Sequence, residues 1–155
     1  MMSNKAKNSL ARLIAKRLYS ESELRKKLSK HSEEEIEDAI EWGKEQGFVN
    51  DERFARAFVH DTLLLNPQGK RLLYIKLNQK GVKASISELI LQEEYPDELE
   101  AEIITKIANK YVKSLKEEDN TKKLKKLCGY LLRRGFPKQL VYRTAREAVN
   151  LDISM

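Results

Sequence analysis

The feature that most constrains this chain is a pattern that recurs three times along its 155 residues. Each copy has a leucine, a second leucine four residues later, and a turn residue four residues after that. The copies are Leu24-Leu28-Ser32, Leu73-Leu77-Gly81 and Leu127-Leu131-Gly135, at spacings of 49 and 54 residues. Leucines four apart share one face of a helix, and glycine ends a helix with a left-handed backbone at low steric cost. The pattern predicts three copies of a helix that ends in a tight turn.

Segments with apolar residues at helical spacing flank every copy. Leu10-Leu13-Ile14-Leu18, Phe54-Phe58 and Ile104-Ile107-Ala108-Tyr111-Leu115 precede the three patterns, and Ile36-Ala39-Ile40, Ile86-Leu89-Ile90 and Leu140-Val141-Ala145 follow them. Helix starts are predicted from capping boxes at Ser20/Glu23, Ser32/Glu35, Ser85/Glu88 and Asp97/Glu100. We therefore predict an all-α protein of three tandem three-helix repeats, helix-turn-helix-like in plan, at residues 1–50, 51–97 and 98–155. About fifty residues bury little core alone, so the repeats should lean on one another as an elongated, curved array.

Composition agrees with a helical protein of a reducing compartment. Three prolines, six glycines and 35% charged residues suit helices better than sheets. The single cysteine, Cys128, cannot form an intramolecular disulfide, and no apolar run approaches the ~20 residues of a membrane span. We expect a cytoplasmic protein that contacts no membrane. The first 20 residues are basic and free of acids, as a mitochondrial transit peptide would be, but they fit the first repeat.

Residues that could support catalysis or metal binding lack the necessary spacing. His31 and His60 belong to no HExxH motif and to no pairing with Cys128, and no GxxxxGK[ST] or GxGxxG phosphate loop is present. We predict a protein that is not an enzyme and that has no catalytic residue, metal or cofactor.

The acids in the stretch GFVNDERFARAFV, residues 47–59, are the nearest approach to an active site. Asp51 and Glu52 fall in the first turn of a predicted helix, where the helix dipole favours negative charge. Asn50 or Asp51 is expected to cap that helix, with Phe54 and Phe58 on its buried side. This stretch is therefore predicted to join the first and second repeats.

The net charge of +6 is segregated along the chain. Residues 5–30 hold nine basic residues against two acids, and residues 31–52 hold nine acids against Lys44 alone. Residues 84–105 hold seven acids and no basic residue, and residues 106–138 hold eleven basic residues against Glu117, Glu118 and Asp119. Ordinary solvated helix surface is one explanation, but the repeated alternation favours a basic surface for a polyanion.

Residues 122–134 give the clearest candidate surface, because leucines and basic residues separate on a helical wheel and Tyr130 falls among the basic ones. A basic face with an aromatic ring suits single-stranded nucleic acid, and a solvated lysine face with a half-exposed tyrosine is the alternative. Nothing predicts base reading, so we expect phosphate-dominated contact of weak sequence specificity. The candidate binding residues are Lys122, Lys123, Lys125, Lys126, Tyr130, Arg133 and Arg134, then Lys70, Arg71, Lys76 and Lys80 in the middle repeat, and Arg25, Lys26 and Lys30 in the first.

From about Ser9 to Asn150 the chain resembles the RecX family of bacterial recombination regulators. Asp51, Arg53, Phe54 and Ala55 match the family's (I/L)-(D/N)-D-x-R-F-A pattern, and LNQKG at residues 77–81 matches its L-x-x-K-G turn. The chain departs from the family at residues 66–69, NPQG, where Gly-Pro is frequent, and at His31-Ser32, where the first repeat lacks the glycine turn.

The resemblance implies a non-enzymatic protein that lodges in the groove of the RecA recombinase filament and inhibits its ATPase, strand-exchange and co-protease activities. It implies roles in DNA repair, homologous recombination and the SOS response, with auxiliary sequence-nonspecific DNA binding. The expected partners of a monomer are the RecA filament and single-stranded DNA, with double-stranded DNA as a further candidate. One alternative is a helix-turn-helix regulator that binds duplex DNA without RecA, which would need one dominant recognition helix, usually in a symmetric dimer. A purely structural helical adaptor is another.

Overall fold

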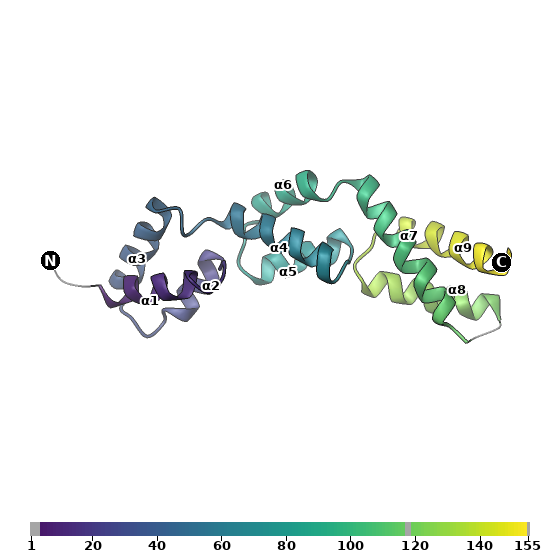
Figure 1. The fold of residues 1–155 in the computed structure, drawn as a ribbon, viewed down its shortest axis with the longest axis horizontal. Coiled ribbons are helices and arrows are strands. Elements are labelled where there is room, and N and C mark those ends of the chain that lie inside the picture. The colour runs from purple at the N-terminus through teal and green to yellow at the C-terminus, as the bar shows by residue number, and fades with distance from the viewer. Residues whose placement is uncertain (1–3, 117–118, 155) are drawn as a thin grey trace. The chain divides into compact units, whose positions relative to one another are not determined.

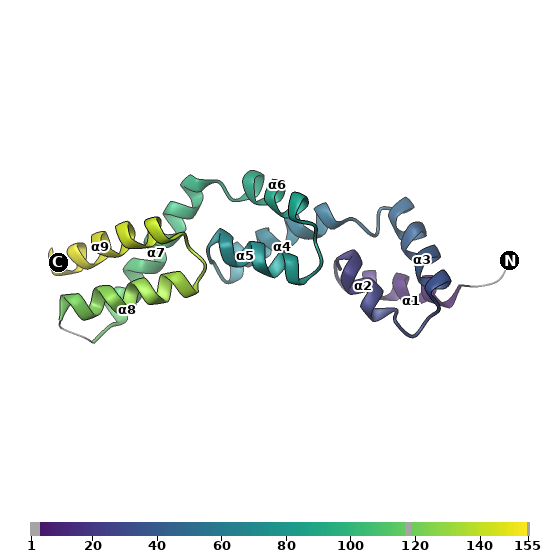
Figure 2. The same cartoon turned by 180° about the vertical axis from the view of Figure 1, so that it is seen from behind.

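The computed structural model describes residues 4–116 and 119–154, and within these ranges it has nine α-helices and no strand. The helices are α1 (Lys5–Ile14), α2 (Glu21–Lys27), α3 (Glu33–Glu45), α4 (Asp51–Leu65), α5 (Lys70–Gln79), α6 (Ala84–Glu94), α7 (Asp97–Ser114), α8 (Asn120–Arg133) and α9 (Lys138–Ser154), as drawn in Figure 1 and from behind in Figure 2. The predicted all-α class is confirmed, with three helices around each leucine pattern. Glu117 and Glu118, which entered the charge pattern, lie outside the described residues.

All six leucines of the repeated pattern are fully buried. Leu24 and Leu28 pack with Leu10 and Ile40 in a core of α1–α3, and Leu127 and Leu131 join a core of α7–α9. Each fully buried leucine contributes roughly 1.5–3 kcal/mol relative to an exposed one. The leucine pairs therefore act as predicted, as the apolar face of the second helix of each repeat.

Two of the four predicted capping boxes are present and two are wrong. Ser20 with Glu23, and Ser32 with Glu35, form reciprocal boxes at the starts of α2 and α3. Ser85 cannot cap α6, because that helix already begins at Ala84 and the Lys83 carbonyl accepts from the first-turn amides. Asp97 lies inside α7, whose N-cap is Pro96 and has no side-chain cap. A sequence match to the box does not distinguish the cap position from the first helical turn.

The first predicted helix is shorter than its apolar spacing suggested. The α1 helix ends at Ile14, so Leu18 lies beyond it in the segment that leads to α2. In that segment the Arg17 guanidinium lies 3.6 Å from the centroid of the buried Tyr19 ring. This contact and the Ser20 cap stabilise the bend between α1 and α2. The segment contains no helix-stopping residue that would have predicted the bend.

The described structure divides into two compact units, and the boundary passes through the middle helices. The first unit contains residues 1–58 and 76–90, and the second contains residues 59–75 and 91–155. Each unit thus combines one terminal set of three helices with one end of the α4–α6 set. The partition of the sequence into repeats 1–50, 51–97 and 98–155 stays a prediction about periodicity.

Within the first unit, the turn after α5 packs against the start of α2. Gly81 has φ +82°, and a Cβ added to it would lie 2.2 Å from the Ser22 Cβ. The Ser20 hydroxyl donates to the Lys80 carbonyl at 2.6 Å, and Asp51 Oδ1 accepts from the Glu21 backbone N–H at 2.8 Å. We call this contact of residues 20–22, Asp51 and residues 80–81 the first joint.

Within the second unit, the turn after α8 packs against the start of α5 in the same way, through a glycine with a left-handed backbone. Gly135 has φ +90°, and its added Cβ would lie 2.3 Å from the Leu72 Cβ. The Gly69 N–H donates to the Arg134 carbonyl at 2.8 Å, and Glu100 Oε2 accepts from the Lys70 N–H at 2.8 Å. We call this contact of residues 69–72, Glu100 and residues 134–135 the second joint.

Both joints solve the same chemical problem. The first N–H groups of a helix have no partner within the helix and need acceptors from elsewhere. In each joint a carboxylate placed 30 residues further along the chain accepts from the first amide of the second helix in a repeat. In the second joint the Gly135 carbonyl also accepts from the Arg71 N–H, at 3.2 Å. Glycine at the turn is required because its backbone is left-handed and lies against the neighbouring segment.

Candidate nucleic-acid interface

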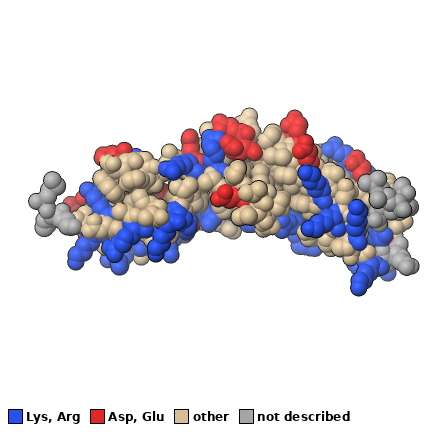
Figure 3. All heavy atoms as spheres, viewed as in Figure 1, with Lys and Arg blue, Asp and Glu red and all other residues tan. Residues whose placement is uncertain are grey.

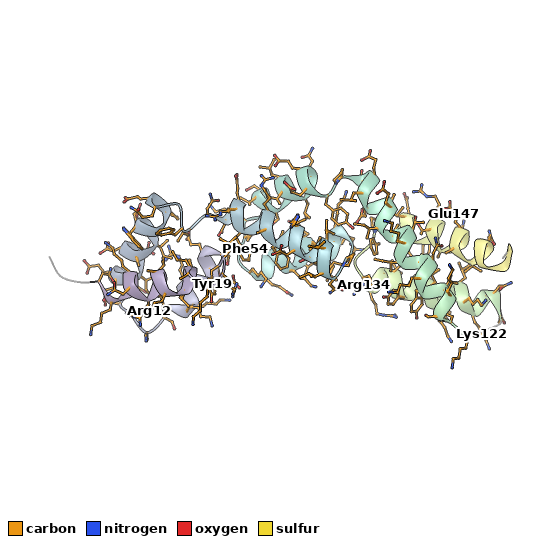
Figure 4. All side chains as sticks on the ribbon, viewed as in Figure 1. Arg12, Tyr19, Phe54, Lys122, Arg134 and Glu147 are labelled. Carbon is orange, nitrogen blue, oxygen red and sulfur yellow. The ribbon has the colours of Figure 1, made fainter. Side chains whose placement is uncertain are left out.

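Helix α8 places the predicted basic residues on one side and a buried apolar stripe on the other. Asp119 begins the helix by accepting from the Thr121 and Lys122 N–H groups, at 2.8 and 3.4 Å. Leu127 and Leu131 are buried in the α7–α9 core, whereas Lys122, Lys125, Lys126 and Arg133 are exposed and Lys123 is half-buried. Figure 3 shows basic side chains over α7 and α8, and Figure 4 shows Lys122 near the start of α8.

Part of this basic side makes no ion pair within the described structure. Lys122, Lys125 and Arg133 make no ion pair with any residue in the described ranges. Exposed ammonium and guanidinium groups held on one helix face attract phosphates through charge, and salt in the solvent screens that attraction. The α8 face, by which we mean Lys122, Lys125, Lys126, Gly129 and Arg133, is therefore the candidate interface.

Tyr130 is less available than its position in the sequence suggested. Its ring stacks on Tyr111 of α7, with centroids 4.0 Å apart and planes 4° from parallel. Both rings pack against the α7–α9 core. One face of the Tyr130 ring is thus covered, so a base could reach only the remaining half-exposed surface. Sequence reasoning assigned Tyr111 to an apolar helix face and missed the pair, which forms only when α7 packs on α8.

Arg134 makes structural contacts within the second unit, and its predicted role in binding stays a prediction. Its guanidinium Nη2 donates to Asn66 Oδ1 at 2.8 Å and to the Pro67 carbonyl, and its own carbonyl is part of the second joint. Its side chain is directed to the loop between α4 and α5 and not to solvent. That loop is also held by Tyr95, whose hydroxyl donates to the Gln68 carbonyl at 2.7 Å.

Lys70 belongs to the second joint. Its Nζ pairs with Asp97 and lies 3.8 Å from Glu100 Oε1. Burial raises the pKa of the Glu100 carboxyl, against the opposing hydrogen bond and charge of Lys70. The hydrogen bond and charge of Lys70 lower the pKa of the exposed Asp97 carboxyl. Burial and the Glu100 charge raise the pKa of the Tyr95 phenol. The Lys70 ammonium therefore interacts with two carboxylates, those of Asp97 and Glu100.

Lys80 belongs to the first joint. Its Nζ lies 3.5 Å from Glu23 Oε2 and 5.5 Å from the centroid of the Phe58 ring. Phe58 in turn stacks on the buried Phe54, with centroids 6.1 Å apart. The predicted place on the buried side of α4 is confirmed for Phe54, whereas Phe58 is half-buried. Lys80 contacts groups of the first joint, and its role in binding stays a prediction.

The remaining candidates of the first and middle repeats are divided between the two compact units. Arg25 is held by Glu21 at 3.1 Å and by Glu37 at 2.5 Å, so its charge is neutralised within its own repeat. Lys26 and Lys30 are exposed near the end of α2, Arg71 is exposed on α5, and Lys76 is half-buried. Arg25, Lys26, Lys30, Lys76 and Lys80 lie in the first unit, and the other nine candidates lie in the second.

Asp51 has a structural role that the sequence did not predict. Asn50 caps α4, because its Oδ1 accepts from the Arg53 N–H at 3.1 Å. Asp51 instead caps the first amide of α2, and burial raises the pKa of its carboxyl. The choice between Asn50 and Asp51, left open by the sequence, is thus resolved in favour of Asn50.

The described residues contain no group of three His, Cys, Asp or Glu side chains that could hold a metal ion. Cys128 is half-buried, and burial raises the pKa of its thiol. His60 lies 3.4 Å from Asp61 in an exposed pair. Among the described helices, none is both long enough and apolar enough to span a bilayer.

Three family models match successive parts of the chain. They are described as the first, second and third three-helix domains of RecX, and they match residues 6–42, 50–89 and 98–144. Each matched segment contains one complete copy of the repeated leucine pattern. Together the three matches run along most of the chain.

Curated relatives carry the name "Regulatory protein RecX". The protein of Caldanaerobacter subterraneus subsp. tengcongensis is 36% identical over 133 residues, which are 84% of this chain and 64% of the relative. Proteins of Clostridium botulinum strain Eklund 17B and Clostridium perfringens strain 13 are 32% and 35% identical, over 96% and 94% of this chain and 71% and 69% of their own lengths. The chain therefore spans about two thirds of the length of these relatives.

Solved structures share the fold. The crystal structure of RecX from Lactobacillus salivarius superposes with a TM-score of 0.85 at 23% identity, covering 95% of this chain and 96% of that one. A crystal structure described as regulatory protein RecX gives a TM-score of 0.83 at 23% identity, covering 92% and 72%. With the domain matches and the relatives more than 30% identical, this likeness has one consistent explanation: the chain belongs to the RecX family.

Proposed function

We propose that this protein regulates RecA recombinase filaments and inhibits their ATPase, strand-exchange and co-protease activities. The observation that carries the proposal is the ordered match of all three RecX domains, together with relatives named as regulatory proteins. The proposed regulator acts in the cytoplasm as a monomer and influences DNA repair and recombination through RecA.

The proposal includes an auxiliary, sequence-nonspecific contact between the α8 face and DNA. Support comes from the three cations of that face without ion pairs in the described structure, Lys122, Lys125 and Arg133. Charge attraction to phosphates explains affinity without sequence preference, because base-edge recognition needs side chains placed in a groove. Single-stranded DNA is the proposed ligand, since Tyr130 leaves a half-exposed ring beside the basic face on which a base could stack.

Two observations weigh against the alternative of a helix-turn-helix regulator of duplex DNA. A recognition helix follows the turn and enters the major groove. In the first two repeats the helices that follow the tight turn are α3 and α6. Helix α3 has three acids in its first helical turn, and α6 has no basic residue. The turn after α5 is moreover packed against α2 in the first joint.

The test is RecA ATPase on single-stranded DNA, titrated with this protein from sub-stoichiometric to stoichiometric ratios. The rate should fall, and the protein should sediment with RecA–DNA filaments. Repeating the titration with a severalfold excess of DNA separates filament binding from DNA sequestration, because only sequestration is relieved by added DNA. An unchanged rate together with no co-sedimentation contradicts the proposal.

A further inference from the structure

Gly129 occupies the middle of the α8 face. Residues three, four and seven positions away share one side of a helix. Lys122, Lys125 and Lys126 precede Gly129 by seven, four and three residues, and Arg133 follows it by four. The position in the middle of these four cations is thus occupied by glycine, the one residue type without a side chain.

The fold gives no reason for glycine at this position. Residue 129 lies inside a regular helix and is absent from the residues with positive φ, unlike Gly81 and Gly135. Within 4 Å of an added Cβ, the described neighbours include only the Arg133 Nη1 atom, at 3.1 Å. That atom is the far end of a flexible side chain, so alanine would fit after a small shift. Glycine is meanwhile the least favourable residue of a helix interior after proline.

A missing Cβ on a basic helix face has a direct consequence for anion binding. It leaves the helix backbone at residue 129 without a side chain of its own among Lys122, Lys125 and Arg133, and the Arg133 Nη1 atom lies 3.1 Å from where a Cβ would be. A phosphate that settles against this backbone lies closer to the Arg133 guanidinium than one held off by a side chain, and Coulomb attraction grows as separation falls. Arginine adds planar donors that match phosphate oxygens, and lysine adds mobile point charges.

We propose that Gly129 is the floor of a phosphate-binding site on α8, with Lys122, Lys125 and Arg133 as its walls, which seats a phosphodiester of a nucleic-acid strand against the helix. The inference rests on the DNA contact in the proposed function and assigns it to a particular spot. A nucleic-acid strand is the occupant because Tyr130, next in the chain, places a half-exposed ring beside the phosphate site. A strand offers both phosphates and flat bases, whereas an acidic polypeptide offers carboxylates alone.

The experiment compares Gly129→Ala and Gly129→Gln with the unaltered protein, using fluorescence anisotropy with a single-stranded oligonucleotide and thermal unfolding. Removing an unfavourable helix glycine should raise Tm by about 2–4 °C in Gly129→Ala. The same variant should lower affinity about threefold, and the longer Gln side chain about tenfold, because phosphates are held farther from the charges. Gain of stability with loss of binding is the expected signature.

Matched controls keep the outcomes separate. Ser85→Gln puts the same side chain on an exposed position of α6 and should leave affinity unchanged. Lys125→Glu should lower affinity; if it does and both Gly129 variants bind as the unaltered protein does, the glycine floor is overturned and the DNA contact stands. If Lys125→Glu has no effect either, the proposed DNA contact itself fails. A lower Tm in Gly129→Ala, or an equal loss of affinity for poly-L-glutamate, would also overturn the phosphate site.

Discussion

At the scale of single residues, Gly47 and Gly81 illustrate two different structural reasons for glycine, which look the same in the sequence. Both have left-handed backbones, with φ of +78° and +82°. An atom added at Gly47 meets nothing within 4 Å, whereas one added at Gly81 lies 2.2 Å from the Ser22 Cβ. The pair therefore isolates the cost of close packing in the first joint from the cost of the backbone conformation.

Gly81→Ala should destabilise the protein more than Gly47→Ala does. Alanine in a left-handed conformation costs about 1–2 kcal/mol at either site. At Gly81 the clash with a Cβ that no rotamer change can move should add about 1–3 kcal/mol. Urea unfolding of both variants measures the difference. Equal free energies of unfolding would mean that residues 20–22 shift away at little cost.

At the scale of elements, the two sides of α8 have different roles. Its leucines build the α7–α9 core and its exposed cations face solvent, while the residues that follow it, 134–135, enter the second joint. A test of DNA contact must therefore avoid Arg134, because its loss would loosen the loop between α4 and α5 as well.

Lys122→Ala combined with Lys125→Ala should weaken binding to single-stranded DNA and flatten its salt dependence. Each lost phosphate contact reduces the slope of log affinity against log salt by about 0.7, so two contacts reduce it by about 1.4. Binding isotherms at several salt concentrations measure the slope. Lys5→Ala with Lys83→Ala removes equal charge at exposed positions of α1 and of the α5–α6 turn and should leave the slope unchanged. If both double variants give the same slope, binding follows net charge and not the α8 face.

At the scale of the whole molecule, the two joints are the recurring connection along the chain. Each joint links the start of the second helix of one repeat to the turn of the following repeat. A carboxylate from a helix that lies between these two segments in the sequence accepts a hydrogen bond in the joint. The middle repeat supplies Asp51 and Gly81 to the first joint and the start of α5 to the second. This sharing explains why the compact units divide the chain within α4, α5 and α6.

The joints predict an unusual pattern of amide hydrogen exchange. The first amide of a helix normally exchanges quickly, because it has no intrahelical partner. The Glu21 and Lys70 amides should instead be protected, and Asp51→Ala should speed exchange at Glu21 by about tenfold or more without affecting Lys70. NMR exchange rates measure both sites.

Asp51→Asn is the conservative control, since its amide oxygen can still accept the hydrogen bond. It should retain protection at Glu21. Fast exchange at Glu21 in the unaltered protein would contradict its protection by Asp51, and a loss of protection at Lys70 in Asp51→Ala would contradict the independence of the two joints.

Basic residues show where sequence reasoning reached its limit. Arg133 and Arg134 are adjacent and chemically alike, yet one is exposed on α8 and the other anchors the loop at Asn66. The partners of Arg134, Asn66 and Pro67, lie almost seventy residues earlier in the chain, so no local pattern distinguishes the two arginines. An exposed basic residue and one hydrogen-bonded within the fold look the same in the sequence. Only the neighbours in the tertiary structure distinguish them.

The sequence by itself determined the helical class, the leucine faces and the glycine turns, because these depend on spacing within one turn or one helix. It also carried the RecX resemblance, which rests on short local motifs. Only the tertiary structure decided that Asp51 caps α2, that Glu100 caps α5 and that Tyr130 stacks on Tyr111. These contacts join segments brought together by packing, and their energy comes from burial and from amides that only a distant partner can satisfy.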